Sequence, residues 1–242
     1  MIVLLTDFGT RDPYVGQVHL KLARLAPQVP VIDLFHDLPH FSVEAAAYLV
    51  NAYCADLPAG AIVMAIVDPG VGGSRDAIVL RSGGCYYVGP NNGIFELLAR
   101  RETIEGCERL FIPPGAAATF HGRDVFAPAA AFLAQGIAPM GETVELARFP
   151  LWPDDNQTIL YIDHYGNAVT GVRARAQHQT LRVRGHILSR ARTFSDRPIG
   201  EPFFYENSSG LLEIAAYCAS AAAVLGLHLS DPFVLDIDGS VA

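Results

Sequence analysis

The sequence feature that most limits the fold is an apolar run that ends in a glycine-rich turn. The run, residues 61–67, is entirely apolar, which is typical of a buried strand. It is followed by Asp68-Pro69-Gly70-Val71-Gly72-Gly73-Ser74-Arg75, and a second apolar run begins at Ala77. Ligands of open α/β sheets bind beyond the carboxyl ends of strands, so the acid and the cation of this turn are candidate site residues. A tight turn with a surface ion pair explains the same residues.

The first half of the chain alternates strand-like and helix-like segments. Hydrophobic periodicity predicts strands over 2–7, 29–34, 61–67, 77–81 and 85–88, and helices over 14–25, 42–54, 93–101 and 124–135. Gly83-Gly84 predicts a hairpin between the last two strands, and Ser42 is a suitable N-cap. This order predicts an α/β architecture whose sheet is mostly parallel with some antiparallel pairing.

The pattern changes after a linker over residues 148–156, which contains prolines and acidic residues. Beyond it we expect short strands over 158–163, 181–183, 187–188 and 233–237, and one long helix over 211–225. We therefore predict two domains. The first, 1–149, is an N-terminal α/β sheet domain, and the second, 157–242, is a smaller, mainly antiparallel, β-barrel-like domain.

Composition excludes several classes of protein. Of the 242 residues 51% are hydrophobic and 17% are charged, which supports a sizeable core and excludes disorder. No apolar run is long enough for a transmembrane helix, and the first residues predict a strand rather than a signal peptide. The net charge is −8 and no basic stripe exists, so neither nucleic acid nor a membrane is an expected partner. The four cysteines form no close pairs, which fits a reducing cytoplasm.

Common cofactor and hydrolase motifs are missing from the sequence. The densest histidine cluster, His36-Asp37-Leu38-Pro39-His40, contains a proline that disfavours a helix aligning both rings, so we expect no metal. The glycine-rich turn lacks the Lys-Ser/Thr of a P-loop, and no nucleophile elbow of the GxSxG type exists. We expect no cofactor.

Polar clusters at strand ends and in the adjoining loops are the remaining candidates. Besides the turn at Asp68 they are Thr6-Asp7-Phe8-Gly9, residues 119–124 with His121, residues 163–167, and Asn207-Ser208-Ser209-Gly210. An aspartate at a strand end can hold a ribose diol, and His121 can accept a proton. Helix caps and turns use the same residue types, so Asp7, Asp124 and Ser208 or Ser209 are also explained as caps. A helix that begins after Ser209 could alternatively bind a carboxylate at its N-terminus.

Taken together and in order, these clusters resemble one family. The motifs are Thr6-Asp7-Phe8-Gly9, Asp68-Pro69-Gly70-Val71-Gly72 with Arg75, Gly89-Pro90-Asn91-Asn92-Gly93, Phe120-His121-Gly122-Arg123-Asp124, Gly166-Asn167, and Asn207-Ser208 with Glu213-Ile214-Ala215. Over nearly its whole length the chain is similar to the S-adenosyl-L-methionine (SAM) hydrolases, also called SAM hydroxide adenosyltransferases. The resemblance implies hydrolysis of SAM to adenosine and L-methionine by a homotrimer with sites between subunits.

The resemblance also implies roles for single residues. Asp68, Arg75 and His121 match the family's catalytic triad, which the related fluorinating and chlorinating enzymes lack, so water is the implied nucleophile. By the same resemblance Asp7 holds the ribose hydroxyls, Phe41 and Phe120 flank the adenine, and Asn167 hydrogen-bonds it. Asp163 and Ser208 hold the methionine end.

Chemistry is consistent with this interpretation and leaves alternatives open. The sulfonium of SAM is already a good leaving group, so an enzyme has to supply an aligned nucleophile and charge stabilisation. We expect Asp68 and His121 to orient the water and receive its proton, and Arg75 to stabilise negative charge. The alternatives are a SAM-dependent halogenase and a module that binds SAM or adenosine with little turnover.

Overall fold

The computed structural model describes residues 1–138 and 141–237. The chain divides into two compact units, Met1–Pro150 and Leu151–Ala242, which are described separately below. That 1–149 and 157–242 are separately folding domains stays a prediction, and residues 238–242 of the second range lie outside the described residues. The predicted α/β class with a smaller antiparallel unit is confirmed.

The N-terminal unit is built on a six-stranded sheet with the order β2-β1-β3-β5-β4-β6. The strands are β1 (Ile2–Thr6), β2 (Val31–Phe35), β3 (Ile62–Ile66), β4 (Ala77–Ser82), β5 (Cys85–Pro90) and β6 (Ile104–Arg109). β1 pairs in parallel with β2 and β3, and β3 pairs in parallel with β5. The β4–β5 and β4–β6 pairs are antiparallel, so the predicted mixture is confirmed. β1 and β3 are fully buried because helices cover both faces of the sheet.

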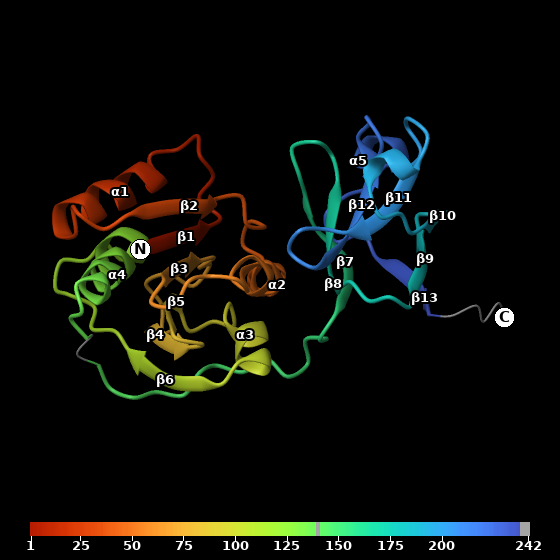
Figure 1. Ribbon diagram of the computed structural model, residues 1–242. Helices are drawn as coiled ribbons and strands as arrows, with labels where there is room; N and C mark the ends of the chain where they lie inside the picture. The colour runs from red at the N-terminus through yellow and green to blue at the C-terminus, as the bar shows by residue number, and fades with distance from the viewer. Residues whose placement is uncertain (139–140, 238–242) are drawn as a thin grey trace. The chain divides into compact units, whose positions relative to one another are not determined.

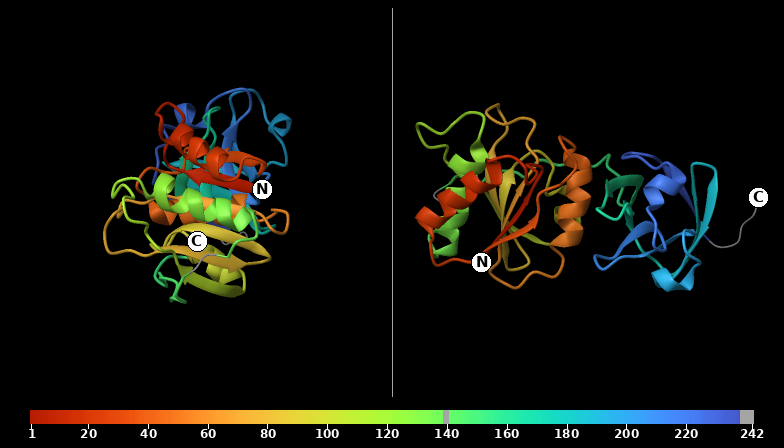
Figure 2. Two further views of the ribbon diagram at one scale, coloured as in Figure 1. Left: turned by 90° about the vertical axis from the view of Figure 1, so that its left-hand side faces the viewer. Right: turned by 90° about the horizontal axis from the view of Figure 1, so that it is seen from above.

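Helices lie on both faces of this sheet (Figures 1 and 2). They are α1 (Tyr14–Leu25), α2 (Val43–Tyr53), α3 (Glu96–Arg101) and α4 (Ala127–Ala134), the last preceded by a π-helical turn, η1 (Gly122–Phe126). α1 packs with α4 on one side of the sheet, and α2 packs with α3 on the other. One hydrophobic core of this unit lies between the sheet and the α1–α4 pair, where Leu22 and Phe126 are completely buried.

Most predicted elements of this unit exist, with differences at their ends. α1 has the predicted ends, and the Gly83-Gly84 hairpin is confirmed by the pairing of Ser82 with Cys85. The predicted helix over 93–101 begins only at Glu96. Ser42 occupies the N-cap of α2 as predicted, although its side chain makes no cap hydrogen bond. β6 was not predicted, because its polar residues lie on an edge strand.

The C-terminal unit contains two antiparallel sheets. One has the order β11-β12-β8-β7 and the other β10-β9-β13. The strands are β7 (Asn156–Ile162), β8 (Ala168–Arg173), β9 (His178–Val183), β10 (His186–Ser189), β11 (Pro202–Glu206), β12 (Leu211–Ala216) and β13 (Phe233–Ile237). Single bridges, Thr158 with Pro232 and Arg190 with Phe204, connect the sheets at both edges. The sheets do not close into a barrel with continuous ladders, and the barrel-like prediction holds in this looser sense.

The predicted helix over 211–225 is wrong. Residues Leu211–Ala216 form β12, and only Ala221–Leu225 are helical, as α5. β12 lies between β11 and β8 and all its residues are buried, so its apolar run has no alternation that would distinguish a strand from a helix. Ser208 and Ser209 consequently lie in a turn between two strands and cap no helix, and no helix N-terminus is available there for a carboxylate.

No helix in residues 1–138 or 141–237 is both long and apolar enough to cross a membrane.

Candidate functional site

Parallel pairing brings two of the predicted acids to one edge of the N-terminal sheet. Thr6 at the end of β1 pairs with Ile66 at the end of β3, and the backbone N–H of Asp7 donates to the Ile66 carbonyl at 3.2 Å. Asp7 and Asp68 therefore follow neighbouring strands where both strands end. This is the edge at which open α/β sheets bind ligands.

Asp7 is joined to Phe41, which follows β2. The Phe41 N–H donates to Asp7 Oδ2 at 3.2 Å, and burial raises the pKa of the Asp7 carboxyl above its usual value. Phe41 has a φ of +59°, which is uncommon for a non-glycine residue, and 77% of its surface is exposed. An exposed aromatic ring held in a strained backbone conformation is a feature of ligand sites.

Asp68, Arg75 and His121 form one hydrogen-bonded cluster. Arg75 Nε donates to Asp68 Oδ1 and Oδ2 at 3.0 and 3.1 Å, and Nη2 also donates to Oδ2. The same Nη2 lies 2.9 Å from His121 Nδ1. Because a guanidinium can only donate, Nδ1 is the acceptor and His121 carries its proton on Nε2. The side chains of Asp68 and Arg75 are only 6% and 9% exposed, so solvent screens the ion pair weakly.

The surroundings of Arg75 leave one of its donors without a partner. Its guanidinium lies over the ring of Phe126, 5.4 Å from the centroid. Its Nη1 is buried and has no hydrogen-bond partner among the described residues. A buried donor of a charged group is rarely left unpaired, so this nitrogen marks a position where an acceptor can bind. Burial and the charge of Arg75 together lower the pKa of His121 below its ordinary value, which favours the neutral ring.

Several residues to which sequence reasoning assigned no role hold this cluster in place. Gly72 has a φ of +75°, and a Cβ there would lie 2.3 Å from the carbonyl oxygen of Ala118, so the two loops pack together at backbone distance. Asn92 donates to the carbonyl of Val67 at 2.9 Å and fixes the residue before Asp68. For Gly72 the glycine-rich turn itself, which permits positive φ, was the signal in the sequence. Nothing in the sequence indicated that Phe126 packs against Arg75.

Aromatic residues form one side of the cavity at this edge. Phe120 contacts Phe8 and Tyr14, with ring centroids 5.8 and 5.5 Å apart, and the Arg123 guanidinium lies 5.1 Å from the Phe120 centroid. The cavity has a volume of about 120 Å³ and is lined by Asp7, Phe8, Phe41, Ile66, Asp68, Val71, Thr119, Phe120, His121 and Gly122. The structure thus brings together five predicted residues, namely Asp7, Phe41, Asp68, Phe120 and His121.

The other predicted residues lie in the C-terminal unit. Asp163 accepts from the backbone N–H groups of Tyr165 and Asn167 at 2.9 and 2.8 Å, and from the Asn167 side chain at 2.9 Å. Asp163 and Asn167 thus share one turn. Ser208 is exposed in the turn before β12, which Asn207 closes by accepting from the N–H groups of Ser209 and Leu211, both at 3.0 Å.

Asn167 also lines an apolar cavity of about 570 Å³ within this unit. Its other lining residues are Tyr165, Phe194, Ala216, Tyr217, Cys218, Ala219 and Ser220. This volume lies in the range of small-molecule sites, about 300–1,000 Å³. Sequence reasoning missed the aromatic residues of this cavity because Phe194 and Tyr217 lie far from Asn167 along the chain.

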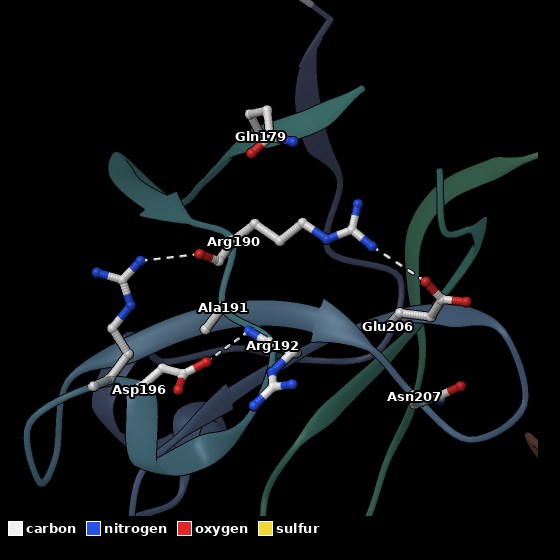
Figure 3. Close-up of a pocket in the computed structure, with 8 residues that line it drawn as sticks. Gln179, Arg190, Ala191, Arg192, Asp196, Glu206 and Asn207 are labelled. Carbon is white, nitrogen blue, oxygen red and sulfur yellow. Dashed lines mark hydrogen bonds and ion pairs between the residues drawn. The ribbon is translucent and has the colours of Figure 1, made fainter. Parts of the chain in front are cut away.

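A third hollow, of about 630 Å³, contains several charged groups, and of the candidate clusters only Asn207 lines it. Figure 3 shows that some of its charged groups bond within the chain: Arg190 Nη2 donates to Glu206 at 3.2 Å, and Asp196 accepts from the Arg192 backbone N–H at 3.0 Å. Within the described parts of the chain, no group of three or more His, Cys, Asp or Glu side chains is arranged to hold a metal ion.

Comparison with protein families matches both units of the chain to one family. Residues 2–143 match the SAM hydroxide adenosyltransferase N-terminal domain, and residues 157–234 match the C-terminal domain of the same family.

Individual relatives agree with this match. An (R)-S-adenosyl-L-methionine hydrolase of Thermus thermophilus is 41% identical, over 96% of this chain and 97% of the relative. A fluorinase of an Actinoplanes species is more distant, with 25% identity over 92% of each chain. The crystal structure of an uncharacterised conserved protein from Thermotoga maritima superimposes with a TM-score of 0.85 at 27% identity, covering 96% of this chain and 98% of that one.

Proposed function

The chain belongs to the SAM hydroxide adenosyltransferase family, and we propose that it hydrolyses SAM to adenosine and L-methionine. The observation that carries the proposal is the buried Asp68–Arg75–His121 cluster beside a cavity, with one guanidinium donor left for an acceptor. A water molecule or hydroxide at that donor suits the reaction, because Arg75 stabilises negative charge as it develops on the oxygen.

The chemical step is a direct displacement at C5′ of the ribose. The water oxygen forms a bond to C5′ while the C5′–S bond breaks, and the electron pair of that bond returns to sulfur. Methionine leaves as a neutral thioether. The water proton passes into the cluster, where the Asp68 carboxylate can accept it directly and His121 Nδ1 can accept it once the hydrogen bond from Arg75 Nη2 is broken. The low pKa of His121 keeps its ring neutral and able to accept.

The remaining predicted residues bind and orient SAM. Asp7 holds the ribose hydroxyls, and Phe41 and Phe120 flank the adenine. Asn167 hydrogen-bonds the base, and the apolar cavity of about 570 Å³ that it lines supports this assignment. Asp163 and Ser208 hold the methionine end. Alignment of this kind is worth several kcal/mol, since a bound water replaces one that must be captured from bulk solvent.

We further propose that the protein is a cytoplasmic homotrimer whose sites lie between subunits. The cavity at the cluster, about 120 Å³, is smaller than the ~300 Å³ at which small-molecule pockets begin, so another surface has to complete it.

Isotope labelling tests the reaction. In water enriched in oxygen-18, the label should enter the 5′-hydroxyl of adenosine, while methionine should leave unlabelled with its thioether intact. Methylthioadenosine with homoserine lactone, or label in methionine alone, would contradict displacement at C5′. A halogenated adenosine formed with added chloride or fluoride would favour the halogenase alternative, to which the distant fluorinases are related. Tight SAM binding without products would favour a binding module.

A further inference from the structure

A line of contacting side chains runs from the end of β1 towards the surface. Thr6 Oγ1 lies 2.8 Å from His36 Nδ1, and His36 Nε2 lies 3.0 Å from Asp33 Oδ1. His19 Nε2 lies 2.7 Å from the same carboxylate oxygen. Thr6 and His36 are buried, whereas Asp33 and His19 are partly exposed. Among the described residues, those that line the cavity of the Asp68 cluster include none of these four.

The donors and acceptors along this line can be assigned. The Phe8 N–H donates to Thr6 Oγ1 at 3.2 Å, and the hydroxyl proton of Thr6 can still be donated to His36 Nδ1. Asp33 Oδ1 lies 3.0 Å from His36 Nε2 and favours the tautomer with its proton on Nε2, although Nε2 makes no hydrogen bond within the described residues. In that tautomer Nδ1 is the acceptor for Thr6. Although burial opposes it, contact with His36 and His19 lowers the pKa of Asp33, so Asp33 faces His36 as a carboxylate.

His36 belongs to a loop that clamps the residues around Asp7. Its carbonyl accepts from the Gly9 N–H at 2.8 Å, and the Leu38 N–H donates to the Thr6 carbonyl at 3.1 Å. His40 Nδ1 lies 3.0 Å from the Asp7 carbonyl. Together with the Phe41–Asp7 bond described above, these contacts lie on both sides of Asp7. The buried Thr6–His36 contact joins the end of β1 to the beginning of this loop.

We propose that Thr6, His36 and Asp33 are positioning residues that hold Asp7 and Phe41 in place for the nucleoside part of the substrate. This inference rests on the proposed function. The physical reason is that Phe41 has a strained positive φ, which persists only where several contacts determine it. If the loop that contains His36 is released, Phe41 can leave its strained backbone conformation. Its N–H, which donates to Asp7, then moves away from the carboxylate. Small displacements of binding groups weaken catalysis even when the reacting residues are intact.

A matched pair of substitutions at Thr6 tests this role. Thr6→Val keeps the shape but removes the hydroxyl, whereas Thr6→Ser keeps the hydroxyl. We expect Thr6→Val to raise KM for SAM about tenfold, which corresponds to the loss of one buried hydrogen bond, with a smaller change in kcat. Thr6→Ser should stay near the wild-type values. A merely structural role would lower the melting temperature and leave the KM of the folded fraction unchanged.

A surface substitution covers the case in which Thr6→Val fails to fold. Asp33→Asn should raise KM about two- to fivefold, because it keeps the side-chain shape but removes the charge that faces both His36 and His19. Asp37→Asn is its control, since Asp37 lies in the same segment but is exposed and outside the line of contacts. Wild-type KM in both Thr6→Val and Asp33→Asn would overturn the inference.

A spectroscopic measurement separates this inference from the proposed function. The ¹⁵N shifts of the His36 ring should show a protonated Nε2 and an unprotonated Nδ1, whether or not the protein turns over SAM. The opposite tautomer in an active enzyme would overturn the inference alone. A wild-type protein that neither hydrolyses SAM nor binds adenosine would overturn the proposed function and this inference with it.

Discussion

At the scale of single residues, Arg75 connects the two other members of the cluster. It donates to both Asp68 oxygens and to His121 Nδ1, and it retains a buried Nη1 that no described residue accepts from. Because the three side chains share one hydrogen-bonded unit, removing one changes the environment of the other two. Their substitutions should therefore be non-additive.

Asp68→Asn keeps the shape of the side chain and removes its charge, and His121→Ala removes an acceptor. We expect each to lower kcat by about 10² or more with little change in SAM affinity. The double variant should lose scarcely more than the worse single one. Steady-state kinetics measures these effects. Asp76→Asn is a suitable control, because Asp76 adjoins Arg75 in sequence but pairs with Arg109. Near wild-type turnover in Asp68→Asn would show that its assigned role is wrong.

The pKa of His121 gives a prediction with a defined sign. Burial and the nearby Arg75 hold it below the ordinary value of 6.5, so between the two values the unfolded chain binds the proton and the folded chain does not. The stability linked to the neutral ring is therefore lost progressively as pH falls from 6.5 down through the lower folded pKa, and turnover should fall only as pH reaches the folded pKa. In Arg75→Ala the pKa should rise, because Asp68 remains without the cation. NMR titration of the His121 ring measures this pKa, with His121→Gln to assign the signal and Arg81→Ala as the control variant. A wild-type midpoint of 6.5 or higher would contradict the prediction.

At the scale of elements, two serines at helix N-caps and two glycines in turns should differ in how much they contribute to the stability of the fold. Ser220 caps α5 by accepting from the Ala223 N–H at 3.1 Å, whereas Ser42 caps α2 by position only. The turn at Gly72 packs against the Ala118 carbonyl, while Gly115 has a similar positive φ with open space around it. Each pair allows one interaction to be isolated.

Ser220→Ala should lower the free energy of unfolding by about 1 kcal/mol, the usual contribution of a cap bond, and Ser42→Ala by less than about 0.5 kcal/mol. Urea unfolding of both variants checks this. Equal losses would mean that the Ser220 contact contributes nothing.

Gly72→Ala should destabilise the protein more than Gly115→Ala. Both variants carry the strain of a positive φ, of about 1–2 kcal/mol, but only the first forces a methyl group against a backbone carbonyl. Gly72→Ala should also lower turnover, because Arg75 lies at the end of the displaced turn. Thermal unfolding and kinetics of the two variants test both effects, and indistinguishable variants would exclude the packing argument.

At the scale of the whole molecule, the predicted binding residues are distributed over two compact units, and the cavity in the first holds about 120 Å³. We expect light scattering to show a trimer, and dilution that dissociates it to abolish SAM binding. A monomer with full activity would contradict both the trimer and the shared site.

The sequence by itself determined the class of the fold and predicted five of the ten residues that line the cavity. The period of α1 and the alternation of strands and helices are local patterns, and local patterns are readable before folding. Asp7 and Asp68 could be expected near one another because both follow strands of a mostly parallel sheet.

Only the tertiary structure decided which contacts these residues make. Leu211–Ala216 became a strand because β8 and β11 pair with it from both sides, which no local pattern records. Two further contacts join residues that lie far apart in the chain: Arg75 with the Phe126 ring, and Thr6 with His36. The positive φ of Phe41 depends on contacts of the same kind. Their geometry follows from the packing of whole elements, because a side chain's partners are set by the backbone that surrounds it rather than by its neighbours in sequence.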